Sequence, residues 1–521
     1  MRWLDFPLQR DEGEYAYAGQ LILGGIPPYE IAYNMKMPGT YLAYAAMMAV
    51  FGQTTTGIHL GLLSVHLASL VFLFLIAQRF FGISGAAVAT SAYTLMTLSP
   101  ALVGMAAQAT HFAVFFALMG IWVLLRLEEK HSWLNCLMSG LLFGTAFQMK
   151  QHALFLGVFG GLYVAWLCIR EEASPASTSL TERTRIIALR LGAFSAGCLL
   201  PFLAVCAWLK MAGVFPQFWF WTFKYAREYV SILTFRDGLR KARLAFGATF
   251  HAAIALWTIV AFGLALLCTA RMDLNRRLFL GGFFIFSFLA ICPGYYFRAN
   301  YFVLLMPAVA LVIGFAVWYG EAWFARTQGP LWLRHLPLVI AILACAESLY
   351  VYRQALFTLP VVEACRRVYP HPSPFPESID VARYIEANTS PNERIAVIGS
   401  EPQIYFYAHR LSSTGFIYTY ALMESQRYAR VMQENMIHDL EQNPPTYLVY
   451  VSIPNSWLMQ PNSSRLLLDW VDRYVDKNMT RVGIFQYDGA DSTAPPQVLW
   501  GPAAATAPLR NPYYISIFKR N

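Results

Sequence analysis

Apolar blocks of about 20 residues recur along the first 352 residues, and they constrain the fold more than any other feature. A helix of about 20 apolar residues spans the hydrocarbon core of a bilayer. With 57% hydrophobic and 13% charged residues, the 521-residue chain is too apolar for an ordinary soluble protein. The sequence therefore predicts a polytopic α-helical membrane protein, with spans at residues 58–79, 84–102, 108–126, 132–149, 151–169, 188–210, 249–270, 278–294, 301–319 and 335–352.

The basic residues follow the pattern that membranes select. Loops on one side of the predicted spans carry most of the arginines, including Arg126, Arg170 and Arg326. The short loops on the other side carry little beyond Lys150 and Arg298. By the positive-inside rule the arginine-rich side is cytoplasmic. This topology accounts for the net charge of +9 without a nucleic-acid partner. We expect a protein of the bacterial cytoplasmic (inner) membrane whose N-terminal segment and C-terminal region are non-cytoplasmic.

Composition changes near residue 353, where charged residues return after the last apolar block. HPSPFPES at 371–378 is a Pro-rich joint. Beyond it, helical patterns alternate with strand patterns, which favours a small, mainly parallel sheet with helices on its faces. The patterns are IDVARYIEAN, RIAVIGS, QRYARVMQENMIHDLEQN, TYLVYVSI, LLLDWVDRYVDKN and RVGIFQY. The predicted organisation is a first exterior loop (1–57), a membrane domain of about ten helices (58–352) with a long exterior loop near 211–248, and a C-terminal α/β domain (353–521).

The N-terminal segment QRDEGEY carries Asp11, Glu12 and Glu14 ahead of the first predicted span. We interpret it as an exterior loop that holds catalytic carboxylates. TYLAYAAMMAVFG at 40–52 is too short to cross a bilayer and is expected to lie along its surface. Because an exported loop needs a membrane helix before it, we also expect such a helix ahead of residue 1.

Further polar residues lie at the predicted outer ends of the spans, on the side of the carboxylates. They are Lys36, His111, Lys150, His152 and Arg298. Carboxylates with cations around them suit a reaction in which an acceptor loses a proton and a phosphate departs. Each residue also has a structural interpretation, as solvated surface, as a helix-end hydrogen bonder or as an anchor among lipid headgroups.

Several catalytic signatures are absent from the sequence. It has no G-x-x-x-x-G-K-[ST], no G-x-G-x-x-G after a strand, no H-E-x-x-H and no G-x-S-x-G. A nucleotide-driven enzyme is therefore not expected. The eight cysteines form no C-x-x-C pair, and Asp11 with Glu12 makes no convincing metal site. No cofactor is indicated, and a divalent metal stays open.

Four short motifs occur in a characteristic order in the membrane region. D-E-x-x-Y at 11–15 is followed by K-x-P at 36–38, by a short helix pattern ending in FG, and by a span ending in RFFG. This order resembles the GT-C membrane glycosyltransferases. More narrowly, it resembles the protein mannosyltransferase-like and lipid A aminoarabinose transferase-like branch of bacterial envelopes. This chain departs from that branch at two positions. It has Glu14 where the branch has arginine, and it has K-M-P at 36–38 where the branch has K-P-P.

The resemblance implies a sugar donor linked to polyprenyl phosphate. It implies that Asp11 is the general base, that Glu12 assists it or orients a substrate hydroxyl, and that Lys36 holds the donor phosphate. We assign Lys150 and Arg298 to the same phosphate. His111, His152 and Glu14 are candidate substrate contacts.

The predicted function is an inverting glycosyltransferase that acts on the non-cytoplasmic face. Its acceptor would be an envelope glycolipid, glycan or protein. A secondary transporter or a flippase of lipid-linked envelope glycans is the main alternative, followed by a glycan polymer ligase and a structural membrane subunit. Transporters usually show repeated halves and polar breaks in mid-span, whereas here the polar residues collect at one face.

Overall fold

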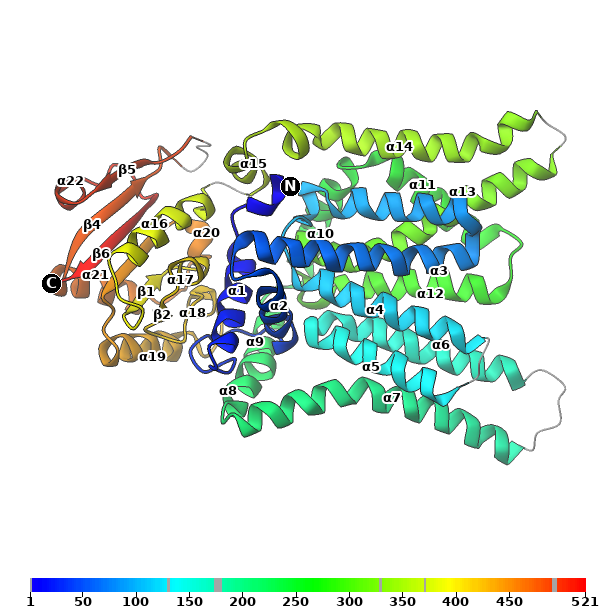
Figure 1. Cartoon of the computed structure of the whole chain (residues 1–521), viewed down its shortest axis with the longest axis horizontal. Helices are drawn as coiled ribbons and strands as arrows, with labels where there is room; N and C mark the ends of the chain where they lie inside the picture. Colours follow the sequence, from blue (N-terminus) through cyan, green and yellow to red (C-terminus); the bar gives the residue numbers. More distant parts are fainter. Residues whose placement is uncertain (1, 129–131, 173–179, 328–329, 370–371, 490–493) are drawn as a thin grey trace.

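A bundle of long helices and a C-terminal α/β domain make up the computed structural model, which describes residues 2–128, 132–172, 180–327, 330–369, 372–489 and 494–521. The bundle lies on the right in Figure 1 and the domain on the left, with the short helices α1 and α2 between them. The N-terminal end therefore lies at the end of the bundle that faces the C-terminal domain.

The bundle contains the predicted apolar blocks as helices. Their bounds are α3 (Thr55–Thr97), α4 (Ala109–Leu125), α5 (Trp133–Met149), α6 (Leu154–Glu172), α7 (Leu180–Met211), α11 (Ile254–Thr269), α12 (Leu274–Ile291), α13 (Met306–Arg326) and α14 (Leu336–Arg353). Within the described residues, six helices are long and apolar enough to cross a membrane. The number is seven if α10 (Phe235–His251) and α11, which meet at 109°, form one broken span. The predicted class, a polytopic helical membrane protein, is confirmed.

Helix α3 covers two of the predicted spans. Its 43 residues would extend about 65 Å as one straight helix, about twice the thickness of a bilayer core. Gly82 interrupts it with φ +68° and ψ −167°, a conformation that residues with a Cβ rarely adopt. This glycine, at the end of RFFG, therefore separates the two spans near the predicted boundary.

The first 57 residues form two helices rather than an open loop. Gln9 caps α1 (Arg10–Leu23): its Oε1 accepts from the Asp11 amide at 3.0 Å, and Glu12 Oε2 accepts from the Gln9 amide at 3.2 Å. Helix α2 (Pro38–Phe51) begins with a proline in its first turn and packs on α1. A short helix thus forms at TYLAYAAMMAVFG, and its place along the membrane surface stays a prediction. QRDEGEY lies largely in α1 rather than in an irregular loop.

The long connection between the sixth and seventh predicted spans is also helical. It comprises α8 (Phe215–Trp219), a π-helix (Phe220–Tyr225), α9 (Ala226–Ser231) and α10 (Phe235–His251). The aromatic run FWFWTFKY at 218–225 comprises the end of α8 and the π-helix. Its side chains Trp221 and Tyr225 are buried against the C-terminal domain rather than displayed to lipid.

The C-terminal domain contains a six-stranded sheet of order β2-β1-β3-β6-β4-β5. β1 pairs in parallel with β2 and β3, whereas β3–β6, β6–β4 and β4–β5 are antiparallel, so the prediction of a mainly parallel sheet is wrong. The strands are β1 (Arg394–Ile398), β2 (Leu411–Ser412), β3 (Tyr447–Ser452), β4 (Met479–Gln486), β5 (Gln497–Trp500) and β6 (Tyr514–Arg520). The helices are α15 (Val361–Val368), α16 (Phe375–Ala387), α17 (Gln403–Ala408), α18 (Tyr420–Met423), α19 (Ala429–Gln442), α20 (Pro454–Trp457), α21 (Leu466–Asn478) and α22 (Pro502–Thr506).

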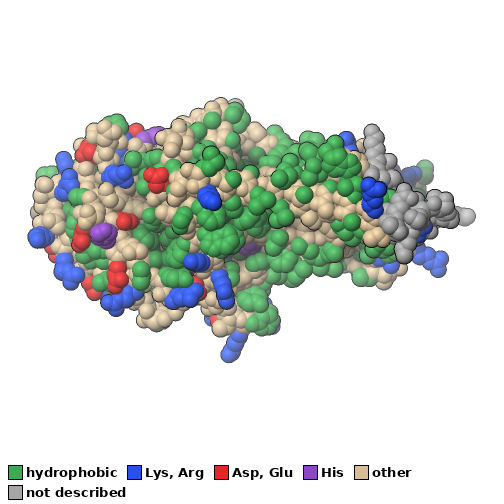
Figure 2. Space-filling view, turned by 90° about the horizontal axis from the view of Figure 1, so that it is seen from below, with side chains coloured by type: hydrophobic (Ala, Val, Ile, Leu, Met, Phe, Trp, Pro, Cys, Tyr) green, Lys and Arg blue, Asp and Glu red, His purple; other side chains and the backbone are tan. Residues whose placement is uncertain are grey.

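Apolar and charged side chains occupy different parts of the surface along the long axis, as is typical of a membrane protein. In Figure 2 apolar side chains dominate the middle, over the bundle, while charged residues of both signs gather on the C-terminal domain. Lys and Arg side chains recur at the far tip of the bundle. The C-terminal ends of α6 and α13 lie at this tip, and α1 lies at the opposite end (Figure 1). This arrangement supports the predicted placement of α1 and the C-terminal domain on one side of the membrane.

Reporter fusions test that placement. Alkaline phosphatase fused after Asn521 is expected to be active, because this enzyme matures only outside the cytoplasm. Green fluorescent protein fused after Arg326 is expected to fluoresce, because the positive-inside rule places that helix end in the cytoplasm. Fluorescence from a fusion at Asn521, with inactive phosphatase there, would contradict the topology.

Candidate active site

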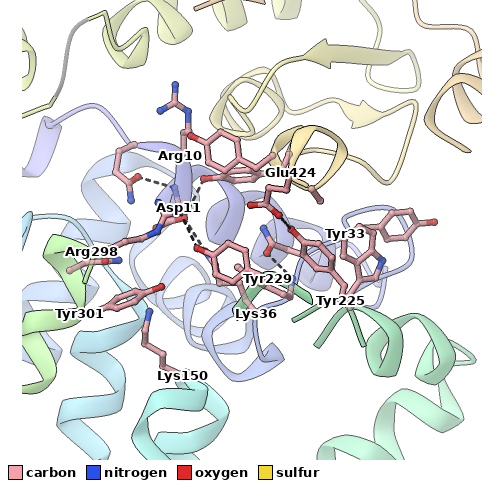
Figure 3. Close-up of a pocket in the computed structure, with 18 residues that line it drawn as sticks. Arg10, Asp11, Tyr33, Lys36, Lys150, Tyr225, Tyr229, Arg298, Tyr301 and Glu424 are labelled. Carbon is pink, nitrogen blue, oxygen red and sulfur yellow. Dashed lines mark hydrogen bonds and ion pairs between the residues drawn. The ribbon is translucent and has the colours of Figure 1, made fainter. Parts of the chain in front are cut away.

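A cavity of about 180 Å³ opens where α1 meets the C-terminal domain and the end of the bundle that faces it. Its wall is assembled from α1, residues 33–36, the turn at Lys150, the π-helix and α9, residues 298–301, and residues 418–424 of the C-terminal domain. In Figure 3 the side chains of Asp11, Lys36, Lys150 and Arg298 converge on this space. The structure thus brings together the four charged residues on which the sequence-based site chiefly depends.

Asp11 and Lys36 form the centre of the site. Lys36 Nζ lies 2.9 Å from Asp11 Oδ1, and the hydroxyl of Tyr418 donates to the same oxygen at 3.2 Å. The Asp11 side chain stays 28% exposed to the cavity. Within the described part of the chain, Oδ2 has no hydrogen-bond donor, so this second oxygen is free to meet a substrate.

Electrostatics keep Asp11 ionised. Burial acts to raise the pKa of Asp11, but the charge and hydrogen bond of Lys36 outweigh it and lower the pKa to about 2. Burial acts to lower the pKa of Lys36. The negative charges of Asp11 and Glu14 outweigh this effect and hold the pKa of Lys36 well above its ordinary value. At neutral pH the pair is a carboxylate and an ammonium.

Lys150 and Arg298 supply further positive charge. Lys150 Nζ lies 4.3 Å from the centroid of the Tyr301 ring, and Arg298 Nη2 donates to the hydroxyl of Tyr229 at 3.1 Å. Among the described residues neither cation forms an ion pair with a carboxylate. Burial, with the nearby charge of Lys36, lowers the pKa of Lys150 to about 7. A bound anion would therefore be stabilised here by cations that lack an anionic partner.

Glu14 lies beneath the site rather than in it. It sits one helical turn after Asp11, its side chain is 1% exposed, and it does not line the cavity. Lys36 Nζ approaches Glu14 Oε2 at 3.3 Å and the hydroxyl of Tyr41 donates to Oε1 at 2.6 Å. Burial raises the pKa of Glu14 to about 7. Its geometry fits a support for Lys36, not the substrate contact proposed from the sequence.

Glu12 points away from the cavity. Its carboxylate accepts from the Ala107 amide at 2.6 Å and lies 3.2 Å from Nε2 of His59, and the side chain is fully buried. These contacts join α1 to α3 and to the start of α4. The structure therefore does not bring Glu12 to the cavity, where it was expected to assist the base or orient a substrate hydroxyl. Its carboxylate joins α1 to the bundle.

The two histidines lie outside the cavity as well. His111 is buried in α4, with its ring centroid 6.2 Å from that of His66. His152 donates from Nδ1 to the Ala290 carbonyl at 2.8 Å, and its ring packs edge-on against that of Tyr301 with 4.5 Å between the ring centroids. Neither touches the cavity, so the candidate substrate contacts at these positions are not supported, although His152 orients the ring beneath Lys150.

The C-terminal domain clamps α1 through contacts that sequence reasoning missed. Arg10 Nη2 forms a buried ion pair with Glu401 Oε1 at 2.8 Å, and Ser456 donates to the other oxygen of Glu401 at 2.6 Å. At Gly13 a Cβ would lie 2.5 Å from Gln403, so the two surfaces meet without room for a side chain. Glu401 thereby fixes the turn of α1 that carries Asp11.

Replacing Tyr418 by phenylalanine is expected to lower kcat by about 10-fold, because the Asp11 carboxylate loses the hydrogen bond that holds it in position. The hydroxyl stabilises the ionised form of Asp11, so its loss raises the pKa of Asp11. The acid limb of the pH–rate profile should therefore move to higher pH. Tyr428→Phe, outside the cavity, is the matched control. A fall in kcat without movement of the acid limb would leave Tyr418 with a structural role alone.

Within the described ranges, we find no group of three or more His, Cys, Asp or Glu side chains arranged to hold a metal ion. The chemistry that can be built from this site uses a carboxylate with one open oxygen and several cations around a small space.

Comparison with known proteins places this geometry in context. Residues 36–195 match the family described as dolichyl-phosphate-mannose-protein mannosyltransferase, a segment that begins at Lys36 and includes Lys150. A search of curated proteins finds no match to the chain.

Solved structures match over most of the chain. The apo structure of ArnT from Cupriavidus metallidurans has 15% identity and a TM-score of 0.56, covering 99% of this chain and 95% of ArnT. The structure of ArnT bound to undecaprenyl phosphate has 16% identity and a TM-score of 0.54, covering 89% and 92%. The Archaeoglobus fulgidus oligosaccharyltransferase tethered with an acceptor peptide has 11% identity and a TM-score of 0.51, covering 95% of this chain and 70% of its own. The chain therefore has the fold of the GT-C membrane glycosyltransferases, and the resemblance found in its sequence motifs is confirmed.

Proposed function

We propose that this protein transfers a sugar from a polyprenyl-phosphate-linked donor to an envelope acceptor, on the non-cytoplasmic face of the bacterial inner membrane. The observation that carries the proposal is the pairing of Asp11 with Lys36, at 2.9 Å, in a cavity that Lys150 and Arg298 also line. A base for the acceptor and cations for a phosphate leaving group are the two requirements of this reaction.

Asp11 takes the acceptor proton in this mechanism. As the acceptor oxygen bonds to the anomeric carbon, its proton passes to Oδ2 of Asp11, the carboxylate oxygen that Lys36 and Tyr418 leave open. One step of attack from the face opposite the leaving group inverts the anomeric centre. A positioned base of this kind contributes about 10²–10⁴-fold in rate.

The cations stabilise the departing group. The bond from the anomeric carbon to the phosphate oxygen breaks with its electron pair on the oxygen, and the product is polyprenyl phosphate. Lys36, Lys150 and Arg298 line the space where this negative charge grows. A phosphate bound beside Lys36 also offsets the effect of the Lys36 charge on Asp11, and this raises the basicity of the carboxylate before the proton is transferred.

The ArnT structure bound to undecaprenyl phosphate and the archaeal enzyme with a tethered acceptor peptide support this choice, since both proteins share the fold. A carrier of lipid-linked glycans, the alternative class, needs no base in the site. The ionised carboxylate with an open oxygen therefore favours a transferase.

Donor cleavage distinguishes the two classes. The purified protein, reconstituted in liposomes with an envelope lipid extract, is given a polyprenyl-phosphate sugar labelled separately in the sugar and in the lipid. A transferase moves the sugar label to a new molecule and releases an equal amount of labelled polyprenyl phosphate. If both labels stay on one molecule while it changes leaflet, the protein is a carrier and the proposal fails.

A further inference from the structure

A second and larger cavity, of about 880 Å³, adjoins the first. On one side it is bounded by the segment between α9 and α10 and by Tyr296. On the other it is bounded by the end of β3, by α20 and the residues after it, and by Tyr513. The side chains of Arg298 and Glu424 line both cavities, so they mark the passage between them.

The position of this cavity in the C-terminal domain is typical of a ligand site. It lies beyond the carboxyl end of β3, which is parallel to β1. Pro512 and Tyr513, which precede the neighbouring antiparallel strand β6, line the cavity as well. Ligands in open α/β sheets commonly bind in the crevice outside the carboxyl ends of the strands.

The wall of the second cavity has the chemistry of a saccharide site. Aromatic rings and polar side chains line it beside aliphatic ones such as Ile232, Leu458 and Leu468. Aromatic rings pack on sugar faces, and amides and hydroxyls bond to sugar hydroxyls. The aromatic and polar side chains are Tyr296, Tyr450, Trp457, Tyr513, Ser452, Asn455 and Gln460. Lys241, Arg298 and Arg465 add positive charge against the single carboxyl of Glu424. We infer that this cavity binds the saccharide part of a negatively charged acceptor and presents its hydroxyl to the first cavity.

Size separates the tasks of the two cavities. Small-molecule sites usually measure about 300–1,000 Å³. The first cavity, at about 180 Å³, holds the reacting atoms and the phosphate but not a further sugar. The second, at about 880 Å³, has room for several sugar units.

A peptide acceptor fits this wall less well. Extended peptides commonly bind by adding a strand to a free sheet edge. β3 is hydrogen-bonded to β1 on one side and to β6 on the other, so it offers no edge to the cavity.

Glu424 is suited to guide a hydroxyl through the passage. The hydroxyl of Tyr225 donates to its Oε2 at 2.5 Å, which fixes the side chain. Burial raises the pKa of Glu424 to about 7, so its carboxyl is protonated in part of the population at neutral pH. In that form it donates one hydrogen bond and accepts others, as a sugar hydroxyl requires.

The inference rests on the proposed function, and a binding experiment tests it separately. The full chain in detergent is titrated in a calorimeter with hyaluronan tetrasaccharide, which carries carboxylates, and with neutral chitotetraose. We expect the charged probe to bind at least about 10-fold more tightly, because Lys241 and Arg465 attract it. Arg465→Ala should weaken the charged probe about 5-fold or more and leave the neutral one unchanged. Tyr513→Ala should weaken both probes, and Arg383→Ala, an exposed arginine on α16, should change neither.

Each other outcome overturns the inference. If neither probe binds, or if binding ignores Arg465→Ala and Tyr513→Ala, the cavity is not a saccharide site. Tighter binding of the neutral probe would refute the charge selectivity. Polyprenyl phosphate release without probe binding would overturn this inference alone, whereas probe binding without release would overturn the proposed function alone.

Discussion

Replacing Asp11 by asparagine is expected to lower kcat by about 10²-fold or more while donor affinity changes little. Asparagine keeps the size of the side chain and its hydrogen bond to Tyr418 but cannot take a proton. A group that acts mainly in the transition state contributes to kcat more than to substrate binding. Initial rates of polyprenyl phosphate release across donor concentrations measure both quantities.

Two variants control the Asp11 experiment. Asp476→Asn, on the exposed face of α21, changes a carboxylate without touching the cavity and should be fully active. Glu14→Gln should be milder than Asp11→Asn, since Glu14 lies outside the cavity and supports Lys36. If Asp11→Asn keeps near wild-type transfer while Glu14→Gln is inactive, the base has been assigned to the wrong carboxylate.

Replacing Lys36 by alanine is expected to lower kcat by about 10²–10³-fold and to raise the KM for the donor as well. The ammonium binds phosphate in the ground state and stabilises the charge that grows on it in the transition state. Its loss also removes the cation that lowers the pKa of Asp11, so the acid limb of the remaining activity should move to higher pH.

The Lys36 experiment needs protein that is demonstrably folded, because the change leaves Asp11 and Glu14 without their shared cation. Thermal unfolding and gel filtration in detergent provide that check. Lys36→Arg, which keeps the charge, should recover part of the donor affinity, and Lys477→Ala on the surface of α21 should behave as wild type. A folded Lys36→Ala variant with unchanged donor KM would remove Lys36 from the phosphate site.

The bundle and the central ion pair were accessible to sequence reasoning because local signals encode them. Apolar blocks of spanning length gave the helices, and Gly82 marks the boundary between two of them. Asp11 and Lys36 belong to short motifs in a recognisable order, and the structure places them 2.9 Å apart. Such features depend on residues close in sequence, or on lengths that the bilayer fixes.

The different roles of Asp11, Glu12 and Glu14 were not predicted, because residues 9–15 were interpreted as an exterior loop rather than as part of a helix. In a helix, neighbouring residues point about 100° apart, whereas residues three apart share a face. Asp11 and Glu14 therefore share Lys36, while Glu12 turns toward His59 and the bundle. The Gln9 cap with Glu12 three positions later was the available signal for that helix.

The contribution of the C-terminal domain was not accessible from the sequence. Tyr418 lies 407 residues after the carboxylate to which it donates, and Arg10 and Glu401 are 391 residues apart. No local pattern marks such pairs, which exist only once the domain has docked on α1. The antiparallel half of the sheet was missed for a related reason: β6, the last strand, inserts between β3 and β4.

The most direct test of the central claim is to locate the lipid phosphate on the protein. A polyprenyl phosphate with a photoreactive diazirine on its first isoprene unit is bound to the full chain in nanodiscs, irradiated and mapped by mass spectrometry. We expect crosslinks to residues 33–36, to the turn at Lys150 or to residues 298–301. Excess unlabelled polyprenyl phosphate should abolish them, and Lys36→Ala should strongly reduce them. Crosslinks confined to the apolar groove between α11, α13 and α14, or unaffected by Lys36→Ala, would contradict the central claim.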